Sequence, residues 1–128
     1  MIWFWFFMLV CALLVPCIMI GFGNYFSKKA PKEINSTFGY RTSMSMKNKD
    51  TWEFAHKYIG KLWLRIGLII LVLSVAPMLV VFGKDVETVG NISIIIWSVQ
   101  LVLLVGSVIP TEIALKKAFD QSGTRKEI

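Results

Sequence analysis

The chain has 128 residues, of which 55% are hydrophobic and 17% charged, and its formal net charge is +6 at pH 7. The apolar residues gather in runs instead of recurring at the periods of a soluble core, and residues 2–22, 66–82 and 89–110 contain no Asp, Glu, Lys or Arg. A bilayer core needs about 20 apolar residues per helix, and alternating strands are too few for a barrel. The sequence therefore predicts a single all-α integral membrane domain, a bundle of three transmembrane helices spanning residues 1–128.

The first span is expected at about residues 2–23. No basic residue precedes its apolar core, the core is too long for a signal peptide, and no A-x-A-like cleavage site follows. We therefore interpret it as a retained anchor. Trp3 and Trp5 suit an interfacial aromatic belt, and Pro16 should kink the helix because it lacks a backbone donor.

Basic residues predict the orientation of the chain. The connector at residues 24–61 holds eight Lys or Arg residues, and the tail at 111–128 holds four. The turn after the second span has only Lys84 against Asp85 and Glu87. Since short loops rich in Lys and Arg stay in the cytoplasm, we expect the N-terminus outside and the C-terminus inside. Topology and anionic lipid then account for the net charge, and nucleic acid is not expected as a partner.

Asp50 is expected to open the next helix, with Glu53 completing a capping box. The helix is amphipathic and should lie along the cytoplasmic membrane surface before the second span begins at about residue 62 and runs to 82. Gly60 is a plausible bend. The apolar side of this interfacial helix comprises Trp52, Ala55, His56, Ile59, Leu62 and Trp63.

The third span is expected at about residues 90–110, with Asn91 as its cap. Gln100 lies near the bilayer centre, where an amide needs a partner. It could form an interhelical hydrogen bond within the bundle or across a homodimer, or it could line a ligand or ion pathway. Gly106 and Ser107 are further candidate contacts in such a homodimer.

The connector is unusually rich in polar side chains for so apolar a chain. A guanidinium with nearby hydroxyl and amide groups could hold a lipid phosphate or a peptide carboxylate. The same residues could instead form a structural network, for example by pairing Arg41 with Glu112. His56 could be a proton switch or an interfacial ring. The sequence offers no catalytic triad, H-E-x-x-H motif or phosphate-binding glycine loop, so we expect no catalytic residue, metal or cofactor.

One stretch, "GYRTSMSMKNKDTWEFAHKYIGKLW", resembles the signature of the SdpI family of bacterial membrane proteins. The matching positions agree in order and spacing, and the layout of one span before and two after agrees as well, in a short, three-span form. The positions that match are Gly39, Tyr40, Arg41, Thr42, Ser45, Asn48, Thr51, Trp52, Ala55, His56 and Gly60.

The resemblance implies a protein of the bacterial cytoplasmic membrane that gives immunity to a secreted, membrane-active peptide toxin. It also implies a signalling role in which a cytoplasmic repressor is held at the membrane. As alternatives, a membrane enzyme or transporter could act on a phosphate-bearing lipid through Arg41, Asn48, Thr51 and His56, or the chain could be a tethered signalling adaptor. The binding residues expected in a pocket at the inner face are Gly39, Tyr40, Arg41, Thr42, Ser45, Asn48, Thr51, Trp52 and His56.

Overall fold

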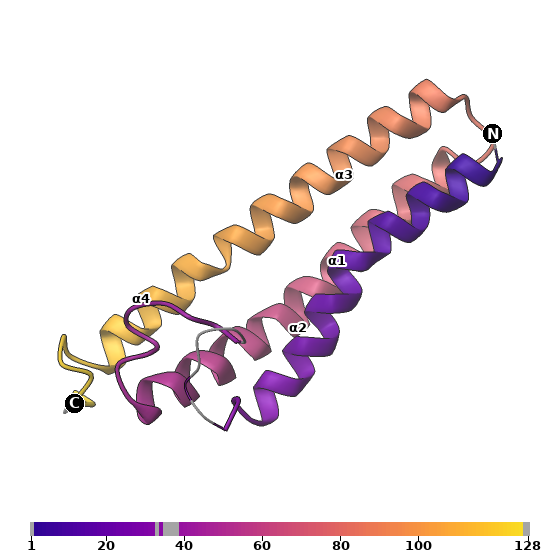
Figure 1. The fold of residues 1–128 in the computed structure, drawn as a ribbon. Helices are drawn as coiled ribbons and strands as arrows, with labels where there is room; N and C mark the ends of the chain where they lie inside the picture. The colour runs from indigo at the N-terminus through magenta and orange to yellow at the C-terminus, as the bar shows by residue number, and fades with distance from the viewer. Residues whose placement is uncertain (1, 33, 35–38, 127–128) are drawn as a thin grey trace.

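The computed structural model describes residues 2–32, 34 and 39–126. Their regular secondary structure is helical, apart from one isolated bridge. The helices in chain order are α1 (Ile2–Lys28), α2 (Lys49–Val80), α3 (Val86–Gly106) and α4 (Val108–Ala118). They run back and forth along one long axis, with the two termini at opposite ends (Figure 1). Three helical stretches are long and apolar enough to cross a membrane, the third being α3 and α4 taken together. The predicted all-α fold with three spans is confirmed.

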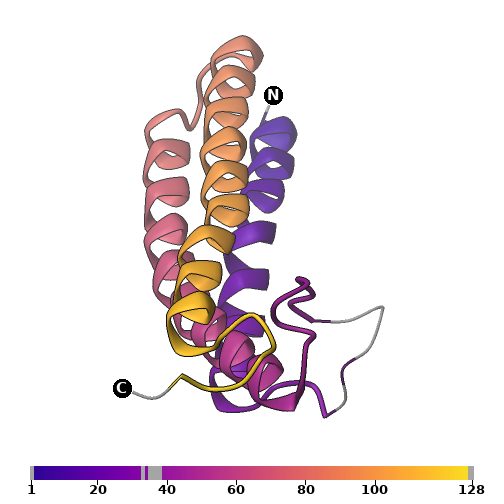
Figure 2. The same ribbon diagram turned by 90° about the vertical axis from the view of Figure 1, so that its left-hand side faces the viewer.

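Glycines allow α1 and α2 to pack closely against each other, and α3 and α4 lie in front of this pair in Figure 2. A Cβ atom at Gly23 would lie 2.8 Å from the Gly60 carbonyl oxygen, and one at Gly60 would lie 2.7 Å from the carbonyl carbon of Phe26. Small residues at such crossings let two backbones approach, as in other membrane helix pairs. Gly60 is therefore a contact point within a continuous helix, where the sequence suggested a bend.

The start of α2 differs from the expectation. Its N-cap is Asn48, not Asp50, because Asn48 and Thr51 form a reciprocal capping box. The Thr51 N–H donates to Asn48 Oδ1 at 2.9 Å, and the Asn48 N–H donates to Thr51 Oγ1 at 3.1 Å. Asn and Asp are equally good caps, and the Thr51 hydroxyl decides between them. Since α2 runs unbroken to Val80, the location of its first turns at a membrane surface stays a prediction.

The third membrane-length segment also begins earlier than expected. The N-cap of α3 is Asp85, and Asn91 lies inside the helix. Glu87 in the first turn suits the positive end of the helix dipole, which favours the earlier start. The segment is interrupted at Ser107, whose hydroxyl accepts a hydrogen bond from Trp63 Nε1 at 2.9 Å. Pro110 follows within the first turn of α4, where a missing N–H costs little.

Polar contacts inside the apolar bundle satisfy carbonyls that the helices leave unpaired. Pro16 has no N–H, so the Ala12 carbonyl has no helical donor, and Gln100 Nε2 donates to that carbonyl at 2.7 Å. The same nitrogen lies 2.9 Å from Ser74 Oγ, so Gln100 connects all three membrane-length segments. Gln100 is only 2% exposed. Gln100 Nε2 and the Ser107 hydroxyl are thus engaged within the chain, and a homodimer through these residues stays a prediction.

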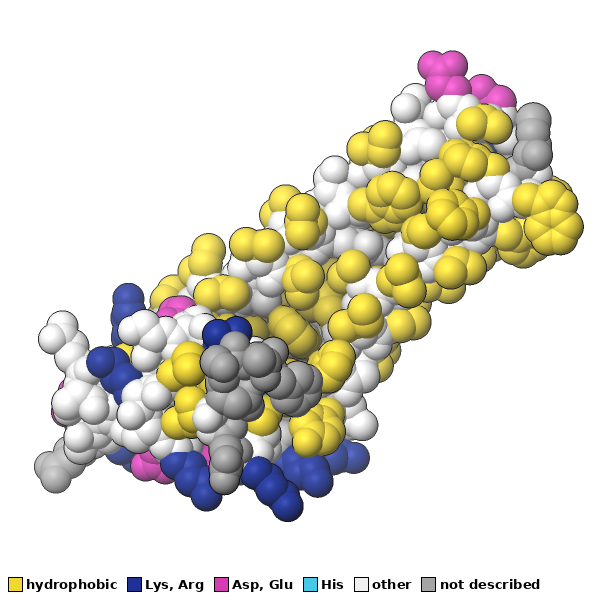
Figure 3. All heavy atoms as spheres, in the orientation of Figure 1, with side chains coloured by type: hydrophobic (Ala, Val, Ile, Leu, Met, Phe, Trp, Pro, Cys, Tyr) yellow, Lys and Arg dark blue, Asp and Glu magenta, His cyan; other side chains and the backbone are white. Residues whose placement is uncertain are grey.

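The side chains divide the surface into a long apolar waist and two polar ends (Figure 3). Large apolar side chains such as Val102, which is 70% exposed, face outward along the waist. Lys and Arg gather at the end that carries the C-terminus, and the opposite tip displays acidic side chains. Exposed apolar surface on this scale is the pattern of helices that face lipid.

Candidate functional site

The predicted binding residues lie where the connector folds back onto the start of α2. His56 is fully buried there, and both its ring nitrogens are engaged. The Tyr40 N–H donates to Nε2 at 2.8 Å, and Nδ1 lies 2.8 Å from the Trp52 carbonyl oxygen. Because Nε2 must accept, the proton of the neutral ring is on Nδ1, which donates to Trp52. His56 therefore fixes the connector to α2.

Gly39 is required at the point where the connector meets this ring. Its φ is +107°, a backbone conformation that residues other than glycine rarely adopt. A Cβ atom there would lie 2.6 Å from His56 Nε2 and 3.3 Å from the Trp52 ring. Trp52 itself is 1% exposed and donates from Nε1 to the Pro31 carbonyl at 3.0 Å. Gly39 and the rings of His56 and Trp52 thus form one packed unit.

Glu112 joins the connector to α4. One carboxylate oxygen accepts from the Tyr40 hydroxyl at 2.6 Å and from Thr42 Oγ1 at 2.9 Å. Burial, with a further contribution from Glu112, raises the pKa of the Tyr40 phenol far above its usual value, so the phenol remains a donor. The suggested pairing of Glu112 with Arg41 is corrected, since among the described residues Glu112 is engaged by two neutral donors.

Two hydroxyls and an amide complete the network. Ser45 Oγ donates to the Tyr40 carbonyl at 3.0 Å, and Thr51 Oγ1 donates to the Ser45 carbonyl at 3.0 Å. Asn48 Nδ2 donates to the Gly123 carbonyl at 2.7 Å and so holds the C-terminal tail. The contribution of Gly123 was missed from the sequence. The available signal in the sequence was a glycine between Ser122 and Thr124, a pattern typical of a turn. In the structure this glycine has a φ of +87°.

Arg41 differs from the other motif residues. Its side chain is exposed, and within the described part of the chain its guanidinium takes part in none of the hydrogen bonds of the network. The remaining eight predicted residues are brought together around the connector, the first two turns of α2, and α4. A planar guanidinium presented to solvent can bind a carboxylate or phosphate with two parallel hydrogen bonds.

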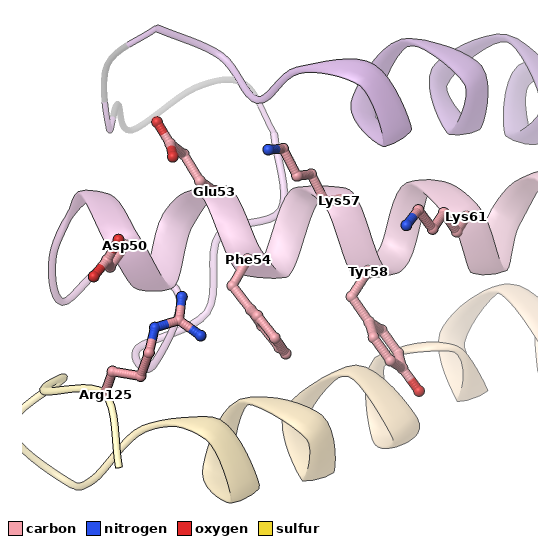
Figure 4. Close-up of a pocket in the computed structure, with 7 residues that line it drawn as sticks. All are labelled: Asp50, Glu53, Phe54, Lys57, Tyr58, Lys61 and Arg125. Atoms are coloured by element: carbon pink, nitrogen blue, oxygen red, sulfur yellow. The ribbon is translucent and has the colours of Figure 1, made fainter. Parts of the chain in front are cut away.

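A charged cleft of about 300 Å³ lies between α2 and the C-terminal tail (Figure 4). Asp50, Glu53 and Lys61 project from α2 in different directions, and Arg125 reaches from the tail toward the Asp50 end of the helix. The Arg125 guanidinium carbon lies 4.8 Å from the centre of the Phe119 ring, which fixes the tail against α4. The sequence did not predict this cleft because it forms only when the tail folds back. The described residues contain no group of three His, Cys, Asp or Glu side chains placed to hold a metal.

Chemically, the motif is a scaffold more than a reaction centre. Its hydroxyls, amide and imidazole donate to or accept from backbone groups and Glu112, which satisfies buried polar groups that would otherwise be costly. What the scaffold positions is the exposed Arg41, in the loop between two anchored residues, Tyr40 and Thr42.

Two comparisons with known proteins find relatives of this chain. The SdpI/YfhL protein family matches residues 32–111, which include the connector from Lys32 onward, α2 and α3, and which end one residue before Glu112. The chain is also 31% identical over 87 residues to the uncharacterized protein YfhL of Bacillus subtilis (strain 168), a match that covers 68% of this chain and 66% of that protein. No solved structure matches. With more than half of its length matched by the family, this chain is a member of the SdpI/YfhL protein family.

Proposed function

We propose that this protein protects a bacterial cell against a membrane-active peptide toxin, and that it does so by binding and not by catalysis. The observation that carries the proposal is the state of the motif. Its buried polar groups, such as those of His56 and Thr51, form hydrogen bonds within the chain. A site of this kind maintains a shape and presents one side chain, Arg41, without a free acid or base. Immunity is the role that membership of the SdpI family implies.

The surface that would meet a toxin is the tip opposite the motif. There the Trp5 ring lies 4.6 Å, centre to centre, from Phe82, which brings the start of α1 against the turn between α2 and α3. Trp3 is 81% exposed beside them. Aromatic side chains of this type anchor peptides at a membrane–water boundary. In the orientation we propose, with the N-terminus outside, this tip faces the exterior.

The lipid-enzyme alternative needs Arg41, Asn48 and His56 to face one pocket. Asn48 bonds Gly123 and the Thr51 backbone, and His56 is enclosed between Tyr40 and Trp52. This arrangement favours the binding proposal. The adaptor alternative has one observation in its favour, the exposed Arg41 at the end of the molecule that also carries the basic tail, and it would place repressor capture at that end. We include it as a second role that the experiment below separates.

The test is survival of a sensitive Gram-positive host that expresses the protein and is challenged with a panel of membrane-active peptide toxins. Wild type is expected to protect against at least one toxin. Trp3→Ala should reduce protection, whereas Val102→Ala, a similarly exposed apolar change in the middle of α3, should not. Equal sensitivity of wild-type and empty-vector cells to every toxin, with the protein correctly inserted, would overturn the proposal.

Arg41 is tested in the same assay against a matched neighbour. Arg41→Ala is expected to lower protection, whereas Lys47→Ala, which removes another exposed connector cation, should not. Protection that is lost in Trp3→Ala but complete in Arg41→Ala would assign Arg41 to the adaptor role. Reporter expression under a toxin-responsive repressor is the measurement for that role.

A further inference from the structure

Two neighbouring hollows on α1 fit a single lipid molecule. The first, of about 510 Å³, lies at the basic end, where α1 ends and α2 begins. Lysines dominate its lining, and among the described residues that line it Glu53 is the one acidic side chain. The lysines are Lys28, Lys29, Lys32, Lys49 and Lys57. All five are exposed, so their ammonium groups are free to turn toward an anion.

The second hollow is apolar and lies one to two turns further into the apolar waist. It measures about 360 Å³ and is lined by Ile18, Gly21, Phe22 and Tyr25. A Cβ atom at Gly21 would have no neighbour within 4 Å, so the glycine leaves a gap in the helix surface. Apolar walls at this depth suit an acyl chain.

Helical spacing places the two hollows on one face of α1. Gly21, Tyr25 and Lys28 or Lys29 follow each other at intervals of three or four residues, which puts them in one row. Tyr25 lines the apolar hollow, and Lys29 Nζ lies 5.8 Å from the centre of its ring. The apolar groove therefore leads directly to the lysine cluster.

We propose that these two hollows together bind one anionic phospholipid, with its phosphate-bearing headgroup among the lysines and one acyl chain along Gly21. Charge complementarity selects an anionic over a zwitterionic headgroup, since five lysines and one carboxylate stand among the described residues of the lining. The apolar groove selects a lipid over a soluble phosphate. The site is separate from the motif network and does not depend on toxin immunity.

The experiment is native mass spectrometry of the full chain in detergent, titrated with palmitoyl-oleoyl phosphatidylglycerol (POPG) or the matched phosphatidylcholine (POPC). We expect one POPG molecule to be retained at roughly tenfold lower added lipid than POPC, since each lysine near a headgroup contributes substantially to binding. Lys28→Gln/Lys29→Gln should reduce POPG retention by about tenfold. The control pair Lys116→Gln/Lys117→Gln, in the last turn of α4, should change it by less than about twofold.

Gly21→Leu tests the acyl-chain half, because a Cβ atom there meets nothing within 4 Å and the rest of the side chain would occupy the groove. It should weaken retention of POPG, whereas Gly106→Leu, at another glycine with open space around its Cβ position, should not. Equal retention of POPG and POPC, an equal loss in the two lysine pairs, or no effect of Gly21→Leu would overturn the proposal. Displacement of POPG by millimolar inorganic phosphate would also overturn it, since a soluble anion would then be the better ligand.

Discussion

The motif end and the membrane-spanning waist of this protein solve the same problem, unpaired buried polar groups, in different ways. At the motif end many side chains bond one another and the connector backbone, so that Tyr40, Glu112 and Asn48 form a continuous network. In the waist, isolated side chains each match a single carbonyl. Gln100 donates to the Ala12 carbonyl, four residues before Pro16. Trp5 Nε1 donates at 2.7 Å to the Met78 carbonyl near the end of α2.

The difference teaches where the two regions tolerate change. Where water is absent, an unpaired carbonyl is costly and has few alternative donors. The contacts of Gln100 and Trp5 therefore each supply a donor to a carbonyl that a proline or a helix end leaves without one. The motif network instead sets the path of a loop with no regular structure of its own. Removal of one member should loosen several others.

The largest effect is expected where α1 and α2 touch. Gly60→Ala should destabilise the protein by about 3 kcal/mol, because the added Cβ meets backbone atoms of α1 that cannot rotate away. The measurement is thermal unfolding in detergent. Gly106→Ala is the control, since it adds the same atom to a helix with open space and should be neutral or slightly stabilising. Equal melting temperatures for the two variants would contradict the close helix contact.

His56→Ala tests the motif network. It leaves the buried Tyr40 N–H without an acceptor and opens a cavity, so we expect a loss of about 2 kcal/mol. His56→Gln, whose longer amide can still offer an acceptor, should lose less. Chemical denaturation of both variants in the same detergent gives the comparison. If the two lose equal stability, the hydrogen bond to Tyr40 contributes nothing beyond packing.

Gln100→Leu tests the waist, and a smaller loss of about 1 kcal/mol is expected for an interhelical hydrogen bond in a membrane protein. The partner change is Pro16→Ala, which gives residue 16 an N–H for the Ala12 carbonyl. In that background Gln100→Leu should cost less, and a double-mutant cycle measures the coupling. A coupling of zero would show that the amide does not compensate for the proline.

Tyr40 gives a spectroscopic test of the motif network, in which the titration of its phenol is measured. Since burial and Glu112 raise its pKa above the unfolded value of about 10, its contribution is fully present below that pH and is lost at higher pH. The absorbance difference at 295 nm between wild type and Tyr40→Phe should therefore show no phenolate at pH 11. A titration step below pH 11 would contradict the buried hydrogen bond to Glu112.

The sequence predicted the spans and the motif well, because long uncharged runs have a single explanation in a bilayer. It could not predict the partners of the motif side chains. Glu112 is 72 residues from Tyr40, with α2 and α3 between them, and the connector that holds Tyr40 has no periodicity that would place the two together. Thr51 rather than Glu53 decided the helix start, and either spacing satisfied the rule for caps. The tail contact at Gly123 depended on a fold-back that only the three-dimensional path reveals.

The central claim is that the motif residues hold the fold while Arg41 is held out for binding. The most direct measurement is thermal unfolding of Arg41→Ala beside Thr51→Ala in detergent. The account predicts that Arg41→Ala unfolds like wild type, within about 0.5 kcal/mol as for other exposed positions. Thr51→Ala, which loses its bonds to the Ser45 carbonyl and to Asn48, should be less stable by about 1–2 kcal/mol. A loss in Arg41→Ala equal to that in Thr51→Ala would contradict the account, because Arg41 would then be part of the scaffold.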